Sequence, residues 1–258
     1  MQEVESQMPQ LEFLDRQEEQ WALLRQHQGG GGRSLAIFVH GFLGDHLTTW
    51  GRLPEMLCEH AQNDPVLAGW DFLFLGYPTR KIVSYLDIAR VIATQWEKAA
   101  TGRPPFGGAY VRLALLGHSL GTLGIRQLLC AGIMQPPGML NSLHSVTLFG
   151  TPLNGSMLAQ FGGTLVGGEI AEALKPGNPQ LRMLRSWNET VHPHLQWHGV
   201  RVILGTDDQV VGNQYADLVE FAGDAKPAFL LNFDHKSLVK PNNWATSTIR
   251  DEIIGALQ

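Results

Sequence analysis

The sequence predicts an α/β fold with a mostly parallel central sheet of about six strands and helices on both faces. The first observation is a series of short apolar runs without polar alternation, at residues 35–40, 71–76, 111–116, 144–149, 200–204 and 228–232. Such runs are typical of strands buried on both faces. Helical patterns separate them, at about 52–62, 84–100, 120–133, 179–191, 212–222 and 241–256. Strands that alternate with helices favour a parallel sheet.

Local signals mark the ends of several helices. Ser84 with Asp87 three residues later resembles a capping box, and Gly102 follows the last turn of the same segment. Asn178–Pro179 places a capping residue before a proline in the first turn. With 258 residues and 44% hydrophobic content, the chain can bury one sizeable core.

A separate N-terminal segment is expected before this core. Leucines and a tryptophan among Glu, Gln and Arg predict a helix over 11–28, and four glycines at 29–32 read as a flexible linker. The sequence therefore predicts an N-terminal helical segment and linker at 1–33 and one folded domain at 34–258.

Composition excludes several classes of protein. A net charge of −5 gives no basic footprint for nucleic acid. The polar N-terminus lacks a secretory signal, and no apolar run approaches the roughly 18 residues that span a bilayer. Two cysteines argue against a disulfide framework. We therefore expect a cytoplasmic protein without a transmembrane segment; its oligomeric state is left open.

The segment Gly117–Gly121 reads G-x-S-x-G between an apolar strand and a helical pattern. In that context the motif predicts a nucleophile elbow, a strained turn that lifts Ser119 out of the end of a strand. Without such a context the motif is common in loops. We interpret Ser119 as a catalytic nucleophile.

An elbow serine needs backbone donors for an oxyanion. Strand 35–40 runs into His40-Gly41-Phe42-Leu43-Gly44, where the glycines let the backbone turn inward. One donor is expected from this loop and the other from the residue after the nucleophile, which predicts the backbone N–H groups of Phe42 and Leu120 as the oxyanion donors. The plainer interpretation of His40-Gly41 is a turn that only ends the strand.

The serine also needs an acid and a base. Asp207 and Asp208 follow the strand at 200–204, and the spacing from Gly205 favours Asp208 as the acid; the other would be a solvated turn residue. His235 follows the last strand, and the chain order Ser119, Asp208, His235 suits it as the base. Most of the other histidines lie at positions that suggest no catalytic role; His118 is expected to point away from the nucleophile. No Cys/His cluster suggests a metal, and the chemistry requires no cofactor.

HGFLG (40–44), GHSLG (117–121), GTPLNGS (150–156), LGTDDQVV (204–211) and DHKSLVKP (234–241) together resemble the serine esterases and lipases of the α/β-hydrolase fold. Within them the chain is similar to the branch of GPI inositol-deacylases and serine-active-site phospholipid-remodelling proteins. The resemblance covers roughly residues 34–258. It implies Ser119 as nucleophile, Asp208 as acid, His235 as base, and Phe42 and Leu120 as oxyanion donors. Thr122 stands where many relatives have a third glycine.

These residues predict serine-dependent hydrolysis of carboxylic (acyl) esters through an acyl-enzyme, on short- to medium-chain acyl esters or lipids. A thioesterase, an amidase or a phospholipid acyltransferase would use the same triad, and a non-catalytic binding protein on a hydrolase scaffold is a further alternative. Residues 157–172, apolar and rich in glycine, form either a minimal lid or an ordinary part of the core.

Overall fold

The computed structural model describes residues 11–17, 20–26, 33–79, 81, 84–133, 139–156, 169–186, 200–211 and 227–258. Its centre is an eight-stranded sheet in the order β1-β2-β4-β3-β5-β6-β7-β8. The strands are β1 (Leu11–Arg16), β2 (Trp21–Gln26), β3 (Arg33–Val39), β4 (Trp70–Leu75), β5 (Tyr110–His118), β6 (Leu143–Phe149), β7 (Val200–Gly205) and β8 (Ala228–Leu230). From β4 to β8 all neighbours are parallel, which confirms the predicted α/β class.

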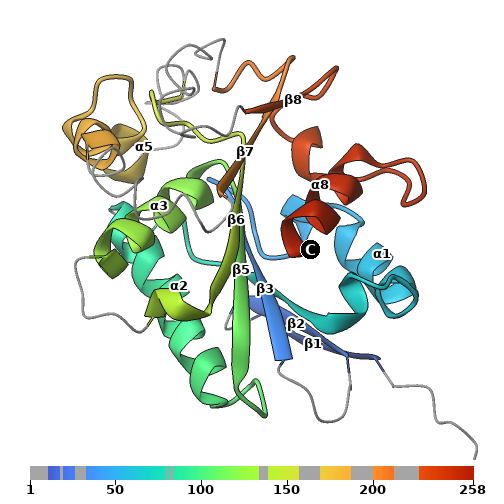
Figure 1. Ribbon diagram of the computed structural model, residues 1–258. Coiled ribbons are helices and arrows are strands. Elements are labelled where there is room, and N and C mark those ends of the chain that lie inside the picture. Colours follow the sequence, from blue (N-terminus) through green and yellow to red (C-terminus); the bar gives the residue numbers. More distant parts are fainter. Residues whose placement is uncertain are drawn as a thin grey trace, which may run out of the picture.

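Helices cover both faces of this sheet (Figure 1). They are α1 (Leu53–His60), α2 (Tyr85–Thr101), α3 (Leu120–Ile133), α5 (Glu169–Ala173) and α8 (Thr248–Leu257). Figure 1 shows α2, α3 and α5 on one side of the sheet and α1 and α8 on the other. The predicted capping box at Ser84 and Asp87 begins α2, and Gly102 ends it in the left-handed conformation.

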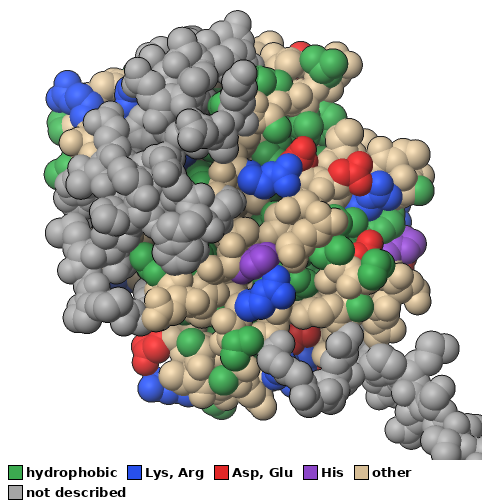
Figure 2. Space-filling view, in the orientation of Figure 1, with side chains coloured by type: hydrophobic (Ala, Val, Ile, Leu, Met, Phe, Trp, Pro, Cys, Tyr) green, Lys and Arg blue, Asp and Glu red, His purple; other side chains and the backbone are tan. Residues whose placement is uncertain are grey.

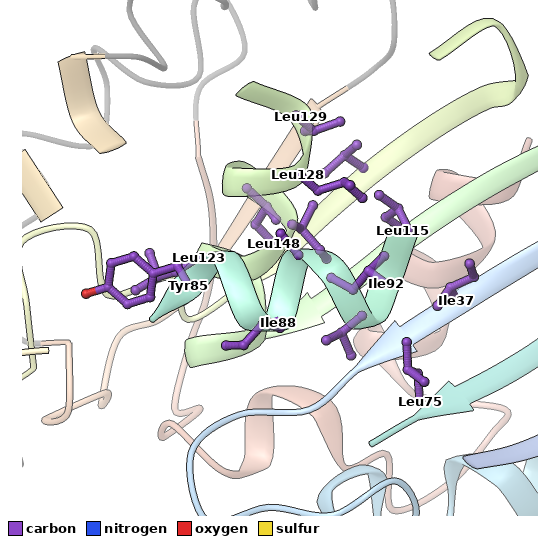
Figure 3. Close-up of a cluster of buried hydrophobic side chains, with 14 of the residues drawn as sticks. Ile37, Leu75, Tyr85, Ile88, Ile92, Leu115, Leu123, Leu128, Leu129 and Leu148 are labelled. Atoms are coloured by element: carbon purple, nitrogen blue, oxygen red, sulfur yellow. The ribbon is translucent and has the colours of Figure 1, made fainter. Parts of the chain in front are cut away.

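Two apolar cores follow from this arrangement, one on each face. The larger one joins α2 and α3 to the sheet through side chains such as Ile88, Ile92, Leu115 and Leu123 (Figure 3). Cys130 lies in this core, whereas Cys58 packs against the core of the opposite face. Both cysteines are free thiols.

The prediction of an N-terminal helix over 11–28 was wrong. Residues 11–26 form the antiparallel hairpin β1–β2, and β2 pairs with β4, so these residues extend the sheet from about six strands to eight. Trp21–Leu24 are buried without alternation because β2 lies inside the sheet and is covered on both faces. Gln20 adopts a positive φ of 56° in the connection between the two strands. The predicted linker at 29–32 lies outside the described residues.

The ends of the other strands and helices differ less from the predicted ones. The last strand ends at Leu230 rather than 232, and the terminal helix begins at Thr248 rather than 241 because Ser247 caps it by accepting a hydrogen bond from the Arg250 N–H. Residues 179–186 of the expected 179–191 helix are helical. The expected helix at 212–222 and residues 157–168 of the expected lid lie outside the described residues, while the lid's last residues belong to α5.

Candidate active site

Ser119 stands alone between the end of β5 at His118 and the start of α3 at Leu120. Its φ is 52°, a left-handed conformation that residues other than glycine seldom adopt and that is concentrated at functional sites. Its N–H donates to the carbonyl of Phe149 at 2.9 Å, and its carbonyl accepts from the Thr122 N–H at 3.0 Å. Neighbouring backbone thus holds the serine in the strained turn that the motif predicted.

Glycines let the loop after β3 lie against this turn. A Cβ added at Gly121 would lie 2.5 Å from the carbonyl oxygens of Val39 and His40. A Cβ added at Gly41 would lie 2.7 Å from the Cβ of Ser119. Both distances are too short for a side chain, so the close approach of the two loops depends on glycine at these positions.

Asp208 and His235 form a buried pair. The Nδ1 atom of His235 lies 2.7 Å from Oδ2 of Asp208, while Oδ1 of Asp208 accepts from the backbone N–H groups of Val210 and Val211 at 2.9 and 3.0 Å. Asp208 is 5% exposed and His235 is 9% exposed. A carboxylate can only accept, so Nδ1 of His235 carries the proton that is shared with Asp208. The Nε2 atom of neutral His235 is then free of hydrogen.

Asp207 takes no part in this pair. Its side chain is exposed, and Oδ1 accepts from the Thr206 hydroxyl at 3.1 Å. Of the two adjacent carboxylates, the structure therefore brings Asp208 to the imidazole and leaves Asp207 in solvent.

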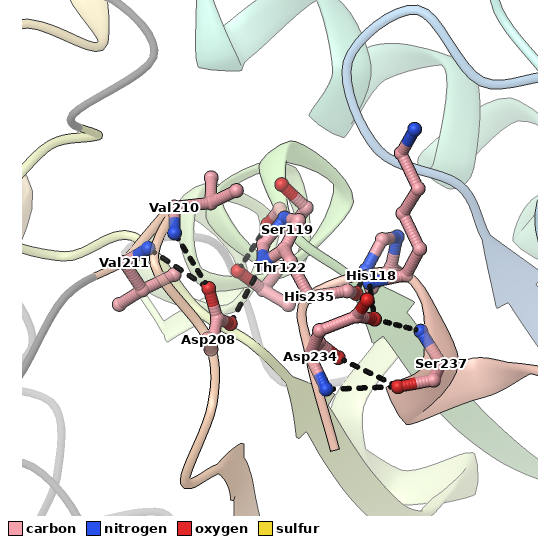
Figure 4. Close-up of polar contacts among 10 residues, drawn as sticks. His118, Ser119, Thr122, Asp208, Val210, Val211, Asp234, His235 and Ser237 are labelled. Atoms are coloured by element: carbon pink, nitrogen blue, oxygen red, sulfur yellow. Dashed lines mark hydrogen bonds and ion pairs between the residues drawn. The ribbon is translucent and has the colours of Figure 1, made fainter. Parts of the chain in front are cut away.

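The turn that carries His235 is fixed by Asp234 (Figure 4). The Asp234 carboxylate accepts from the backbone N–H groups of Lys236 and Ser237, and the Asp234 N–H donates to the Ser237 hydroxyl. Hydrogen bonds from Ser237 hold the pKa of Asp234 below its usual value. This ionised carboxylate stabilises the turn on which the imidazole stands.

The two predicted oxyanion donors lie where the loop and the elbow meet. Leu120 is the first residue of α3, so its N–H has no acceptor within the helix. Phe42 lies in the loop after β3, next to Gly41, where an added Cβ would lie 2.7 Å from the Cβ of Ser119. Neither amide donates a hydrogen bond to another atom of the described residues.

Ser119 and His235 are not hydrogen-bonded to each other within the described residues. Catalytic hydrogen bonds are often long in proteins without substrate and shorten in the reactive complex. The structure therefore contains the hydrogen bond between Asp208 and His235, but none between Ser119 and His235 within the described residues.

His118 was given no role by the sequence, and the structure packs it against His235 (Figure 4). Its Nε2 atom lies 2.8 Å from the carbonyl oxygen of His235, and the two ring centres are 4.8 Å apart. Burial and the neighbouring His235 lower the pKa of His118 from 6.5 to about 3. No sequence signal reveals this contact, because it joins residues 117 positions apart.

A pocket of about 340 Å³ lies beside the loop after β3. Its walls come from His40 and residues 44–48 after β3, Gly76 and Tyr77 after β4, and Gln17 and Gln20 between β1 and β2. It lies at the carboxyl ends of β3 and β4, where α/β sheets bind ligands, but Ser119, Asp208 and His235 are not among its lining residues. Within the ranges given above, no group of three His, Cys, Asp and Glu side chains could hold a metal ion.

On the face seen in Figure 2, the described residues form no large patch of a single charge. Lysine and arginine side chains alternate there with acidic ones in small groups of both signs. None of the helices in the described parts of the chain has the length and apolar character that a membrane crossing requires.

No family model and no curated protein matches the sequence. Solved structures do match the fold. The mature lipase BlEst2 of Bacillus licheniformis is 17% identical over 91% of this chain and 97% of its own, with a TM-score of 0.58. Phospholipase PlaB of Legionella pneumophila is 19% identical over 88% of this chain, with a TM-score of 0.64, and this chain spans 60% of its length. FphF, a fluorophosphonate-binding serine hydrolase of Staphylococcus aureus, is 10% identical over 92% of this chain and 90% of its own, with a TM-score of 0.59. The protein therefore has the α/β-hydrolase fold.

Proposed function

We propose that the protein is a serine hydrolase that cleaves carboxylic (acyl) esters. The Asp208–His235 hydrogen bond of 2.7 Å carries this proposal. The backbone carbonyl of His235 also accepts a hydrogen bond from His118, the residue before Ser119, so the Asp208–His235 pair is held beside a serine in a strained conformation. Two backbone donors hold the Asp208 carboxylate against Nδ1 of His235, which is the arrangement that orients the histidine of a serine triad.

The reaction would follow the serine triad. Nε2 of His235 takes the hydroxyl proton as Oγ of Ser119 attacks the ester carbonyl. The carbonyl oxygen becomes an anion that the N–H groups of Phe42 and Leu120 stabilise, each worth roughly 3–4 kcal/mol in known cases. His235 then gives its proton to the departing alcohol. Water opens the acyl-enzyme by the same route, and Asp208 keeps the imidazole in the required tautomer throughout.

The substrate class is an acyl ester with a short to medium chain, or a lipid. The fold's likeness to a lipase and a phospholipase supports a lipid or simple ester. The sequence motifs extend this proposal to the branch of GPI inositol-deacylases and phospholipid-remodelling proteins.

A fluorophosphonate probe tests the proposal directly. The probe should label the wild-type protein at Ser119, as located by mass spectrometry of the modified peptide. Ser119→Ala should remove both the label and the hydrolysis of p-nitrophenyl esters while the protein stays folded, because the hydroxyl makes no hydrogen bond within the described residues. Asp207→Asn, which changes an exposed neighbour of the acid, should keep both.

Failure to label the folded wild-type protein, or labelling at another residue, contradicts the proposal. A panel of p-nitrophenyl esters, acyl-CoA thioesters and anilides then defines the acyl acceptor and the chain length. Preference for the thioester or the anilide by kcat/KM would replace the ester assignment.

A further inference from the structure

His235 is held at two separate points. Asp208 contacts its ring at Nδ1, and His118 contacts its backbone carbonyl oxygen at 2.8 Å (Figure 4). The second contact comes from the elbow itself, because His118 is the residue directly before Ser119 in the chain. One side chain therefore ties the turn of the base to the turn of the nucleophile.

The chemistry of this contact fixes the state of His118. A carbonyl oxygen can only accept, so Nε2 of His118 carries a hydrogen and donates it. Nδ1 is buried and has no hydrogen-bond partner within the described residues. With its pKa lowered to about 3, the ring is neutral at physiological pH, and Nδ1 then carries no hydrogen. His118 is therefore a fixed donor.

The His118 ring is buried between two loops. It is 6% exposed, and the loop after β3 lies close to it, since a Cβ added at Gly41 would lie 3.2 Å from Nδ1. On its other side the ring meets that of His235 at an interplanar angle of 44°. The imidazole thus fills the space between the loop after β3, which bears the predicted donor Phe42, and the turn that bears His235.

We propose that His118 is a positioning residue, whose Nε2–H holds the carbonyl of His235 so that the imidazole keeps its bond to Asp208 and its place relative to Ser119. The inference rests on the proposed function and deepens it. Positioning matters because the base has to reach the serine hydroxyl within hydrogen-bond distance when substrate binds. A neutral donor suits this task, since it adds no positive charge beside His235 when that ring takes up the proton.

Replacements of different length test the donor. In His118→Gln the side-chain amide reaches the position of Nε2 and can still donate to the carbonyl of His235. In His118→Asn the amide is polar but too short, and in His118→Leu the donor is absent. His144→Leu is the control, because His144 lies near the opposite end of the sheet at the start of β6.

Two readouts separate positioning from packing. With p-nitrophenyl esters, the Asn and Leu variants should lose roughly 10- to 100-fold in kcat with KM nearly unchanged, whereas the Gln variant and the control should stay within about threefold of wild type. In NMR spectra of protein with ¹⁵N-labelled histidine, wild-type His118 should be the Nε2–H tautomer. The Nδ1–H signal of His235 should persist in the Gln variant and weaken in the Asn and Leu variants.

The outcomes are distinguishable. Equal kcat in the Asn, Leu and Gln variants, or an Nδ1–H tautomer of His118 in the wild type, overturns the inference. If the Leu variant does not fold, the comparison of Asn with Gln decides. If the wild-type protein neither hydrolyses esters nor reacts with the fluorophosphonate probe, the proposed function fails. The NMR comparison then still decides whether His118 positions His235.

Discussion

Acid should destabilise the protein through two buried histidines, His40 and His118. In His40, Nδ1–H donates to the carbonyl of Gly41 at 2.7 Å, Nε2 accepts from the Tyr77 N–H at 3.1 Å, and the ring stacks on Tyr77 at 4.3 Å. Protonation at Nε2 would break the bond to Tyr77. Burial lowers the pKa of His40 from 6.5 to about 4, and burial beside His235 lowers that of His118 to about 3.

The direction in which the free energy of unfolding changes with pH follows from proton uptake. Between the lowered pKa values and 6.5, these histidines bind protons in the unfolded chain but not in the folded one. The free energy of unfolding therefore rises with pH across that range. The contribution is complete above about pH 6.5 and is lost as the pH falls toward 3 to 4. At pH 5 each histidine should cost about 2 kcal/mol relative to neutral pH, and the pair about 4 kcal/mol. That is a large part of the roughly 5–15 kcal/mol that stabilises a typical domain.

Urea unfolding followed by tryptophan fluorescence at constant ionic strength measures this loss between pH 7.5 and pH 5. His118→Gln removes a titrating ring while it keeps an amide donor for His235, and His40→Gln removes the other ring. Each variant should lose about 2 kcal/mol less than the wild type over the same interval. Other titrating groups are shared by all three proteins and cancel in the comparison. Parallel pH profiles in the wild type and both variants would refute the reasoning.

The remaining predictions concern the site's geometry. Asp208→Asn should lower kcat by several orders of magnitude, by analogy with the roughly 10⁴-fold loss in a known triad, while Asp207→Asn should stay near wild type; esterase kinetics on both variants decide, and a larger loss for Asp207 reverses the assignment. Gly150→Ala should impair activity, because its φ is 57° and a Cβ there would lie 3.1 Å from Nδ1 of His235; wild-type kcat in a folded variant would contradict this. Gly121→Ala should yield little folded protein, since the new methyl group would lie 2.5 Å from carbonyl oxygens at the end of β3; a melting temperature equal to wild type would exclude that clash.

The parts of the site that the sequence could predict are those encoded in short segments. The turn at Ser119 depends on glycines two residues away, and the position of Asp208 depends on its distance from the end of β7, so both can be recognised locally. The structure bears out the fold around them. The contact between His118 and His235 could not be predicted in this way, because it depends on how two distant turns meet.

The N-terminal error has a different cause. Leu11, Leu14, Trp21 and Leu24 are spaced as on one face of a helix, and β2 shows no alternation that would indicate a strand. Its burial comes from β4 and from the cores on both sides, which no window of the sequence includes. Tertiary surroundings therefore decided the structure of this segment against its local pattern.

The hairpin β1–β2 also determines what the sheet presents to other molecules. Without it, the outermost strand would be β4, whose six residues are all buried and include Phe72 and Phe74. A long apolar strand with unpaired backbone groups is a template on which a second chain can add a strand. The strand that lies outermost instead is β1, where Glu12 pairs with Arg25 at 3.1 Å and Asp15 pairs with His46 at 3.0 Å. The charged side chains on the edge strand β1 disfavour pairing with a strand of another molecule. At the opposite edge, β8 is only three residues long and offers little backbone for such pairing.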